Sequence, residues 1–411
     1  MKWLAFFISL ILFAEVYAFI GTKNMASGNR FGYLFYIAYA ISVLLFVLFF
    51  VLLFSEFSER NHVRTPLKNF FYGFVFTIFV TKLVFATFML LSDLVRLGFY
   101  AKDWILNSKD TLEYSQGRRK FVTQIGLAIA AIPFASFFYG ITKGKYNFEI
   151  KKLALDFNDL PSSFHKLKVV QISDIHAGSF DDADEVKRGV EMINDLNPDI
   201  ILFTGDLVNN RANEIEPYVE IFSQLSAKYG KFSVLGNHDY GDYMPYKNEE
   251  ERAKNLVSLF DFHKKMGFDL LNNDNRKINV DGNYIVIAGV ENWGKAPFPQ
   301  YGDLSKAFSN INDNDFVLLM SHDPSHWDEE ILPHKKHVHL TLSGHTHGMQ
   351  FGIDIPGIKW SPVKYRYPRW AGLYSENNQH LYVNKGFGFL GFPGRVGMWP
   401  EITLIELNQI V

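Results

Sequence analysis

The pattern of apolar and polar positions divides the chain into two parts of different character. Its first third contains four long apolar segments, at residues 3–20, 33–54, 70–91 and 121–141. A helix needs about 20 mainly apolar residues to cross a bilayer, and each segment approaches or reaches that length. We therefore expect residues 1–145 to form a membrane anchor of about four transmembrane helices, the third of which ends just before Asp93.

Two charges lie inside the expected membrane-spanning segments, Glu15 and Lys82. Charges within a membrane are costly, so they are usually paired or functional. We favour a Glu15–Lys82 pair that holds the helices together over a transport or relay site. The first segment could instead be a cleaved signal peptide, but Glu15 interrupts its apolar run and no convincing cleavage site follows, which favours an uncleaved helix.

The orientation of the anchor depends on opposing groups of basic residues. Arg118, Arg119 and Lys120 precede the fourth segment, and they resemble a twin-arginine export motif. Basic residues stay cytoplasmic, so this group predicts an extracytoplasmic C-terminal domain. Lys143 and Lys145, after the same segment, favour the opposite side. We expect a multi-pass protein of the cell membrane, with an extracytoplasmic domain as the preferred orientation.

From residue 146 to 411 the pattern is that of an α/β domain. Short, β-branched apolar runs indicate buried strands at residues 167–172, 199–204, 231–235, 284–290, 316–320, 338–342, 381–384 and 402–407. Apolar residues at helical spacing predict helices at 184–196 and 218–227. The early alternation of strand and helix indicates parallel strands, and the scarcity of helices later in the chain predicts mixed sheets.

Polar segments follow several of these strands. They are Asp174-Ile175-His176, Gly205-Asp206, Gly236-Asn237-His238-Asp239, Ser321-His322-Asp323 and Gly344-His345-Thr346-His347. In open α/β sheets ligands bind beyond the carboxyl ends of the strands, so these side chains should converge. An Asp and His donor set suits Mn, Fe or Zn better than Mg alone. In order and spacing, the five segments resemble the signature of the calcineurin-like metallophosphoesterases.

The resemblance implies an α/β/β/α sandwich and a site for two divalent metal ions. Asp174, His176 and His347 would bind the first ion, and Asp206 would bridge both. Asn237, His322 and His345 would complete the second site. A hydroxide that bridges the two ions would attack phosphorus, which would make the chain a phosphodiesterase or phosphatase.

The same resemblance implies roles for residues beside the metals. His238 would stabilise the transition state or protonate the leaving oxygen, and Asp239 could orient His238. Asn209 is a candidate for support of the substrate site rather than for metal ligation. The glycine-rich C-terminal segment around Arg395 resembles a membrane-associated bacterial phosphodiesterase branch. Arg395 is therefore a candidate phosphate contact, with a purely structural role as the competing interpretation.

We expect the substrate to be a phosphoester, on a phospholipid or another lipid-linked phosphate, because the domain is anchored in a membrane. The aromatic-rich residues 360–399 could form an apolar rim, although ordinary packing is slightly favoured. A second hypothesis is a pyrophosphatase that acts on a nucleotide-activated lipid precursor. The same pattern is also compatible with a membrane sensor or scaffold that binds metal without turnover, and with a transporter that has a regulatory domain.

Composition excludes several classes of protein. The net charge of −2 gives no support for nucleic-acid binding, and we expect none. The chain has no cysteine, which excludes disulfides, thiolate metal sites and a cysteine nucleophile.

Overall fold

The computed structural model describes residues 2–58, 65–106 and 116–410. These residues form two compact units, Met1–Thr142 and Lys143–Val411. They are called unit 1 and unit 2 below, and each is described by itself.

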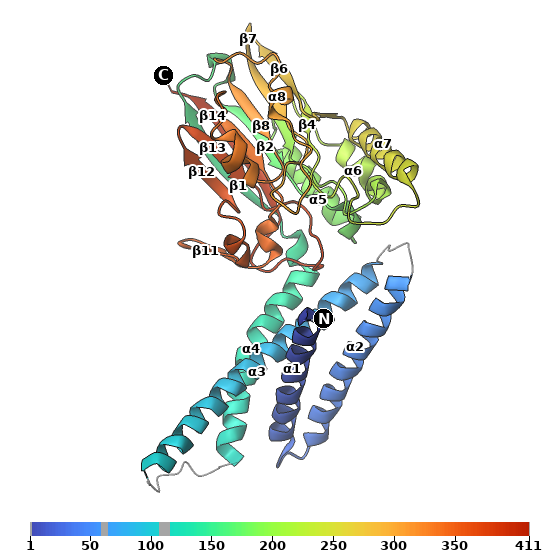
Figure 1. Cartoon of the computed structure of the whole chain (residues 1–411), viewed down its shortest axis with the longest axis vertical. Coiled ribbons are helices and arrows are strands. Elements are labelled where there is room, and N and C mark those ends of the chain that lie inside the picture. The colour runs from blue at the N-terminus through green and yellow to red at the C-terminus, as the bar shows by residue number, and fades with distance from the viewer. Residues whose placement is uncertain (1, 59–64, 107–115, 411) are drawn as a thin grey trace. The chain divides into compact units, whose positions relative to one another are not determined.

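Unit 1 is built from long helices (Figure 1). They are α1 (Lys2–Ala26), α2 (Gly32–Ser58), α3 (Pro66–Leu106) and α4 (Gln116–Thr142). In the described part of the chain all four are long and apolar enough to cross a membrane, which confirms the prediction of four such helices. Pro133 lies inside α4, where neighbouring helices make a proline tolerable.

Two acidic side chains of unit 1, Glu15 and Asp93, have partners on other helices. Lys82 Nζ lies 2.6 Å from Glu15 Oε1, which confirms the expected pair between α1 and α3. The expected end of the third helix before Asp93 is wrong, because α3 continues to Leu106. Asp93 is tolerated within the helix because it accepts a hydrogen bond from the Tyr17 hydroxyl at 3.3 Å and lies 3.8 Å from Arg119.

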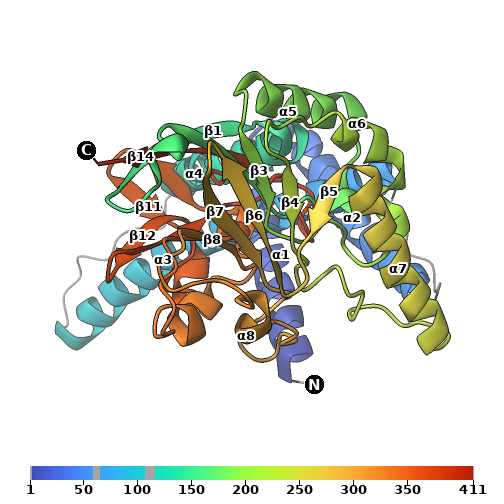
Figure 2. The ribbon, with the colours of Figure 1, turned by 90° about the horizontal axis from the view of Figure 1, so that it is seen from above.

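Unit 2 contains two large mixed sheets and a small hairpin (Figure 2). The first sheet has, in spatial order, β1 (Glu149–Phe157), β14 (Glu401–Gln409), β2 (Leu167–Ile172), β3 (Ile200–Phe203), β4 (Lys231–Ser233) and β5 (Phe268–Leu270). The second has β12 (Gly372–Glu376), β13 (Gln379–Val383), β9 (Leu340–Ser343), β8 (Val317–Met320), β7 (Asn283–Gly289) and β6 (Asp274–Val280). The hairpin pairs β10 (Ile353–Ile355) with β11 (Ile358–Trp360).

Strand direction explains why polar residues gather at one end of these sheets. In the first sheet β2, β3, β4 and β5 run parallel, and only the β14–β2 pair is antiparallel. In the second sheet β7, β8, β9 and β13 run parallel, with β6 and β12 antiparallel at the edges. Parallel strands present their carboxyl ends at the same edge of a sheet.

Three apolar clusters produce the expected four-layer α/β/β/α arrangement. Val169 and Leu202 of the first sheet share a buried cluster with Leu318 of the second, so the two sheets pack face to face. The outer face of the first sheet packs against α5 (Ala183–Asp195), α6 (Val219–Ser223) and α7 (Glu249–Lys265). The outer face of the second packs against α8 (Leu304–Ala307) and the turn at Trp327–Ile331.

The helix expected at residues 184–196 is confirmed as α5, which Asp182 caps by accepting from the backbone N–H groups of Asp184 and Glu185. The helix expected at 218–227 is much shorter. A 3-10 segment (Ala212–Tyr218) that contains Pro217 precedes α6, and α6 itself ends at Ser223.

Candidate metal centre

Strand ends deliver all seven predicted ligands to one buried region. Asp174 and His176 follow β2, Asp206 follows β3, and Asn237 follows β4. The second sheet contributes the rest: His322 follows β8, and His345 and His347 follow β9. The two sheets pack face to face, so the loops that follow their strands meet at one end of the sandwich.

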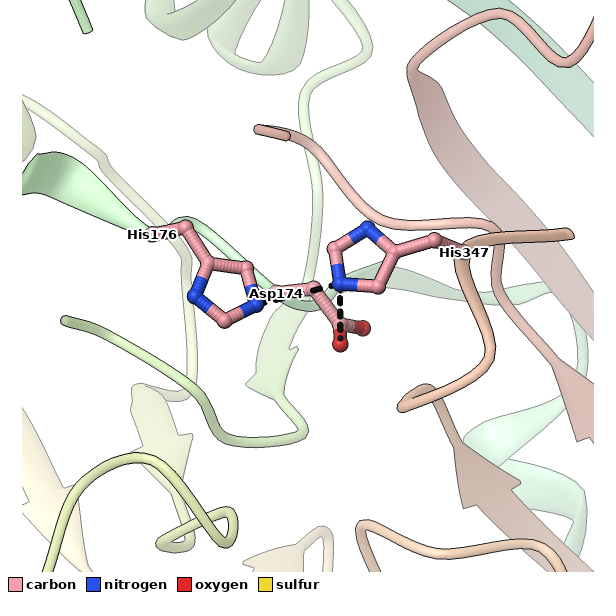
Figure 3. A group of neighbouring side chains, drawn as sticks. All are labelled: Asp174, His176 and His347. Carbon is pink, nitrogen blue, oxygen red and sulfur yellow. Dashed lines mark hydrogen bonds and ion pairs between the residues drawn. The ribbon is translucent and has the colours of Figure 1, made fainter. Parts of the chain in front are cut away.

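The first group consists of Asp174, His176 and His347 (Figure 3). His347 Nε2 lies 3.2 Å from Asp174 Oδ1 and 3.0 Å from His176 Nε2. All three residues are buried. Each turns a donor atom toward the same small space, so the group could hold one cation.

The second group consists of Asp206, His322 and His345, whose ligand atoms lie within 4.8 Å of one another. Asn237 joins this group, because its Oδ1 lies 2.8 Å from His345 Nδ1. Asp206 also connects the groups. Its Oδ2 lies 3.1 Å from His322 Nε2 and 3.5 Å from His176 Nε2.

The ligand loops are held in an uncommon backbone conformation. Five residues of the two groups have positive φ in the left-handed region: Asp174, His176, Asp206, His345 and His347. Non-glycine residues adopt this region rarely, and such strain collects at functional sites. Backbone-to-carboxylate bonds stabilise the loops, since the His345 N–H donates to Asp174 at 3.0 Å and the His238 N–H donates to Asp206 at 2.9 Å.

Two glycines make this close packing possible. A Cβ on Gly236 would overlap the carboxylate of Asp206, and one on Gly344 would overlap Ser173 and Asp174. Only a residue without a side chain lets these loops approach the acidic groups so closely.

The electrostatics of the centre favour a bound cation. Burial lowers the pKa of both His176 and His345, which leaves them neutral with a lone pair to offer. Burial would raise the pKa of Asp206, but His322 and His238 hold it well below its usual range. Burial would likewise lower the pKa of His322, yet Asp206 raises it to about 10. Positive charge beside Asp206 is therefore strongly stabilised.

The hydrogen bonding of His322 also fits a metal. Its Nδ1 lies 2.7 Å from the Thr204 carbonyl oxygen, so that nitrogen carries the proton and donates. Its Nε2 is buried and lies 3.1 Å from Asp206 Oδ2. A histidine whose one nitrogen is fixed by a carbonyl while the other faces carboxylates is typical of metal ligands.

His238 and Asn209 lie beside the centre. His238 Nδ1 is 2.7 Å from the Asn209 carbonyl oxygen, and the ring lies 5.1 Å from that of His176. The Asn209 side chain bonds Ser179 at 3.0 Å. The Asn209 main chain thus contacts His238, and its side chain contacts Ser179.

The structure gives Asp239 a different position from the expected one. Its buried carboxylate accepts four backbone N–H bonds at 2.8–3.3 Å, from Asp206, Leu207, Val208 and Gly236, whereas His238 Nδ1 is bonded to the Asn209 carbonyl oxygen. Burial, with neighbouring Asp206, raises the pKa of Asp239 to about 7. Asp239 holds together the loops that carry Asp206 and Asn237, and the expectation that it orients His238 is wrong.

Arg395 is also placed differently. Its guanidinium is fully buried and donates to the carbonyl oxygens of Lys385, Gly388 and Met398. Its Nη2 lies 3.1 Å from His347 Nδ1, behind the first group. A substrate phosphate could not reach a buried group whose donors are engaged in this way, so the geometry favours the purely structural role.

Two tyrosines at the centre carry no signal in the sequence, and Asp323 stands in one of the five segments without a predicted role. The Tyr367 hydroxyl lies 2.7 Å from His345 Nε2, and Asp323 Oδ2 lies 3.6 Å from the same nitrogen. The Tyr243 hydroxyl accepts a 2.9 Å bond from Asn237 Nδ2, which turns the Asn237 oxygen toward His345. Tyr367 sits in an aromatic-rich segment and Tyr243 in a long loop, where neither stands out.

Comparison with known proteins gives matches to both units. A family described as "Probable Calcineurin-like phosphoesterase, transmembrane domain" matches residues 1–145. A family described as "Calcineurin-like phosphoesterase" matches residues 167–349.

Individual relatives cover mainly unit 2. The chain is 30% identical over 253 residues to the metallophosphoesterase YkuE of Bacillus subtilis, covering 61% of this chain and 82% of that protein. It is 28% identical over 279 residues to a zebrafish "Transmembrane protein with metallophosphoesterase domain", covering 66% of this chain. That match spans only 60% of the zebrafish protein. A metallophosphoesterase of Aquifex aeolicus is 27% identical over 266 residues, with 93% of its length covered.

Proposed function

Because the chain belongs to the calcineurin-like phosphoesterase family and is a membrane-associated metallophosphoesterase, we propose that it hydrolyses phosphoester bonds with two divalent cations. In this proposal residues 1–145 anchor the enzyme in the membrane, and residues 146–411 carry out the chemistry. The cations are Mn, Fe or Zn, since the donors are carboxylate, amide and imidazole groups.

The position of Asp206 carries the proposal. One carboxylate oxygen lies 3.1 Å from a histidine of the second group and 3.5 Å from a histidine of the first. Asp174, His176 and His347 would hold one cation, and Asn237, His322 and His345 the other. A carboxylate between two such groups supports a pair of cations that share a ligand, rather than two separate sites.

Bound divalent cations would acidify a water molecule and neutralise charge on the phosphoryl oxygens. The chain supplies the remaining chemistry. The bond from His238 Nδ1 to the Asn209 carbonyl fixes a proton on Nδ1, so in the doubly protonated ring Nε2 is the nitrogen that can pass its proton to the leaving oxygen and return the ring to neutrality. Asp239 and the left-handed loop residues keep the acceptors and donors in place before substrate binds.

The substrate we propose is a phosphoester on a lipid, such as a phospholipid or a lipid-linked phosphate. The support is the anchor, because four candidate membrane helices in the same chain keep the site at a membrane surface. The basic residues before α4 favour an extracytoplasmic catalytic domain. Labelling of Asp313→Cys with a membrane-impermeant maleimide in intact cells tests on which side of the membrane the catalytic domain lies. Asp313 is 96% exposed, and the natural chain has no cysteine.

Hydrolysis of bis-p-nitrophenyl phosphate by the full chain in detergent, with Mn²⁺, tests the reaction. We expect Asp206→Ala to abolish turnover and His238→Ala to lower kcat by about 10²–10⁴-fold, the usual contribution of a general acid. Asp313→Ala and His165→Ala, which change exposed residues away from the centre, should keep full activity. Robust turnover by Asp206→Ala would refute the metal assignment.

The lipid assignment has a separate test. Release of phosphate or of a headgroup from phospholipid vesicles, compared with the soluble diester, separates the lipid substrate from the general reaction. Turnover of the soluble diester alone would support a phosphoester hydrolase and would contradict a lipid substrate. A metal-loaded chain that turns over neither would support a sensor or scaffold instead of an enzyme.

A further inference from the structure

The β10–β11 hairpin has its apolar side chains on the outside. Ile353, Ile355 and Ile358 are 44–55% exposed, and Ile355 pairs directly with Ile358 across the hairpin. Most of the exposed large apolar side chains of unit 2 also lie between residues 349 and 373. Exposed apolar side chains grouped in this way mark a contact with an apolar partner.

Ion pairing fixes which face of the hairpin points outward. Asp354, between the two isoleucines of β10, turns inward, and its Oδ2 lies 2.7 Å from the ammonium of buried Lys385. Opposite Asp354, the Lys359 ammonium donates to the Ala371 carbonyl at 2.8 Å. Successive side chains of a strand point to opposite faces, so these polar anchors hold the isoleucines on the other face.

The hairpin lies close to the place where the chain joins unit 2. Gly144 follows the end of α4 by two residues and is packed against Trp399 and the Arg395 carbonyl. The same segment, at Val396, accepts the 2.9 Å hydrogen bond of the Gly352 N–H at the base of the hairpin. Two residues reach about 7 Å at most, so this segment stays near the membrane surface at which α4 ends.

We propose that the outward face of this hairpin, Ile353, Ile355 and Ile358, inserts into the lipid interface of the membrane from which α4 emerges. Continuity of the chain is the argument for lipid as the partner, because the residues on which Gly144 packs also support the hairpin. Charge agrees with it: exposed Lys364 and Arg366 follow β11 closely in the sequence and suit anionic headgroups.

The small size of the patch fits this partner. Three isoleucines would hold a free protein on a membrane only weakly, but a covalent tether keeps the local concentration of lipid surface high. The hairpin would then fix the orientation of a domain that is already anchored.

Such docking would act on the rim of the metal centre. The hairpin starts soon after His347 and leads into the segment with Tyr367, whose hydroxyl contacts His345 at 2.7 Å. A hairpin held in lipid would therefore bring this rim to the headgroup layer.

Site-directed fluorescence on the full chain in nanodiscs tests the proposal without using enzyme activity. An environment-sensitive dye is attached to Ile355→Cys or Ile358→Cys in the cysteine-free background. The matched control is Val257→Cys on α7, an apolar residue with 58% exposure, close to the 55% of Ile355. In Figures 1 and 2, α7 lies on the other side of unit 2 from β11. Thermal melting of each labelled variant confirms that it is folded.

Relative to the dye at 257, we expect dyes at 355 and 358 to emit at shorter wavelength and to be quenched less by aqueous iodide. They should also be quenched by lipids that carry a spin label near the headgroup. The dye at 257 should keep its iodide quenching. Equal iodide access at 355 and 257 would overturn the proposal. Protection at 355 without quenching by the labelled lipids would also overturn it, and would identify a protein or second-copy contact instead.

Discussion

Replacing Asp239 by alanine should destabilise unit 2 severely. The carboxylate accepts four buried backbone N–H bonds, from Asp206, Leu207, Val208 and Gly236. Each buried donor left unsatisfied costs about 1–3 kcal/mol. Water can enter the space that alanine leaves, so the lower end of the range applies, and the total is about 4 kcal/mol. That is a large part of the roughly 5–15 kcal/mol by which folded domains are stable.

The assay is thermal unfolding of the full chain in detergent, followed by tryptophan fluorescence. One kcal/mol lowers the Tm of a domain of this size class by about 2–4 °C, so Asp239→Ala should lower it by roughly 8–16 °C. Asp239→Asn should fall in between, because one amide oxygen can still accept from Leu207 and Val208 while the amide group cannot accept from the other two donors.

The control is Asp313→Ala, which removes a carboxylate that is 96% exposed and lies 3.3 Å from Lys336. Exposed ion pairs contribute about 0–1 kcal/mol, so its Tm should stay near that of the wild type. A Tm for Asp239→Ala equal to that of Asp313→Ala would refute the reasoning. Lost activity with an unchanged Tm would instead restore the idea that Asp239 serves His238.

Three further outcomes follow from the structure. Chelation with EDTA should abolish hydrolysis by the wild type, and added Mn²⁺ should restore it. His322→Ala should stay inactive at the same Mn²⁺ concentration. Hydrolysis that survives EDTA would contradict a role for the metal. Lys82→Met should leave Glu15 without its cationic partner and cost about 3–5 kcal/mol, and adding Glu15→Gln should recover most of the lost Tm; equal melting of the single and double variants would contradict the pairing. Burial lowers the pKa of His263 to about 3. As the pH drops, the unfolded chain therefore takes up a proton at this residue before the folded chain does. The free energy of unfolding falls below about pH 6.5, by about 2 kcal/mol at pH 5. The Tm difference between pH 7 and pH 5 should therefore be smaller in His263→Leu, and an unchanged difference would contradict the assignment.

The sequence predicts the central strands well because of where they lie. β3 and β8 are buried at every position, so their sequences are continuous apolar runs. β1 was not predicted, because this edge strand alternates exposed and buried residues and carries Lys151 and Lys152. The convergence of the polar segments was predictable for a related reason, since parallel strands deliver their following residues to one edge.

The roles of individual side chains were less predictable. Asp239 and Arg395 both stand in motif-like segments, yet one binds backbone N–H groups and the other binds carbonyl oxygens. Such partners come from loops distant in sequence, and no local pattern shows them. Tyr367 reaches His345 only because the segment after the hairpin folds back onto the centre.

The number of divalent cations bound to each chain tests the central claim most directly. Elemental analysis of the full-length protein, loaded with Mn²⁺ and passed through a desalting column, should give two equivalents for the wild type and clearly fewer for Asp206→Ala. One equivalent or none in a correctly folded wild type, or two equivalents retained by Asp206→Ala, would contradict a pair of cations joined by this carboxylate.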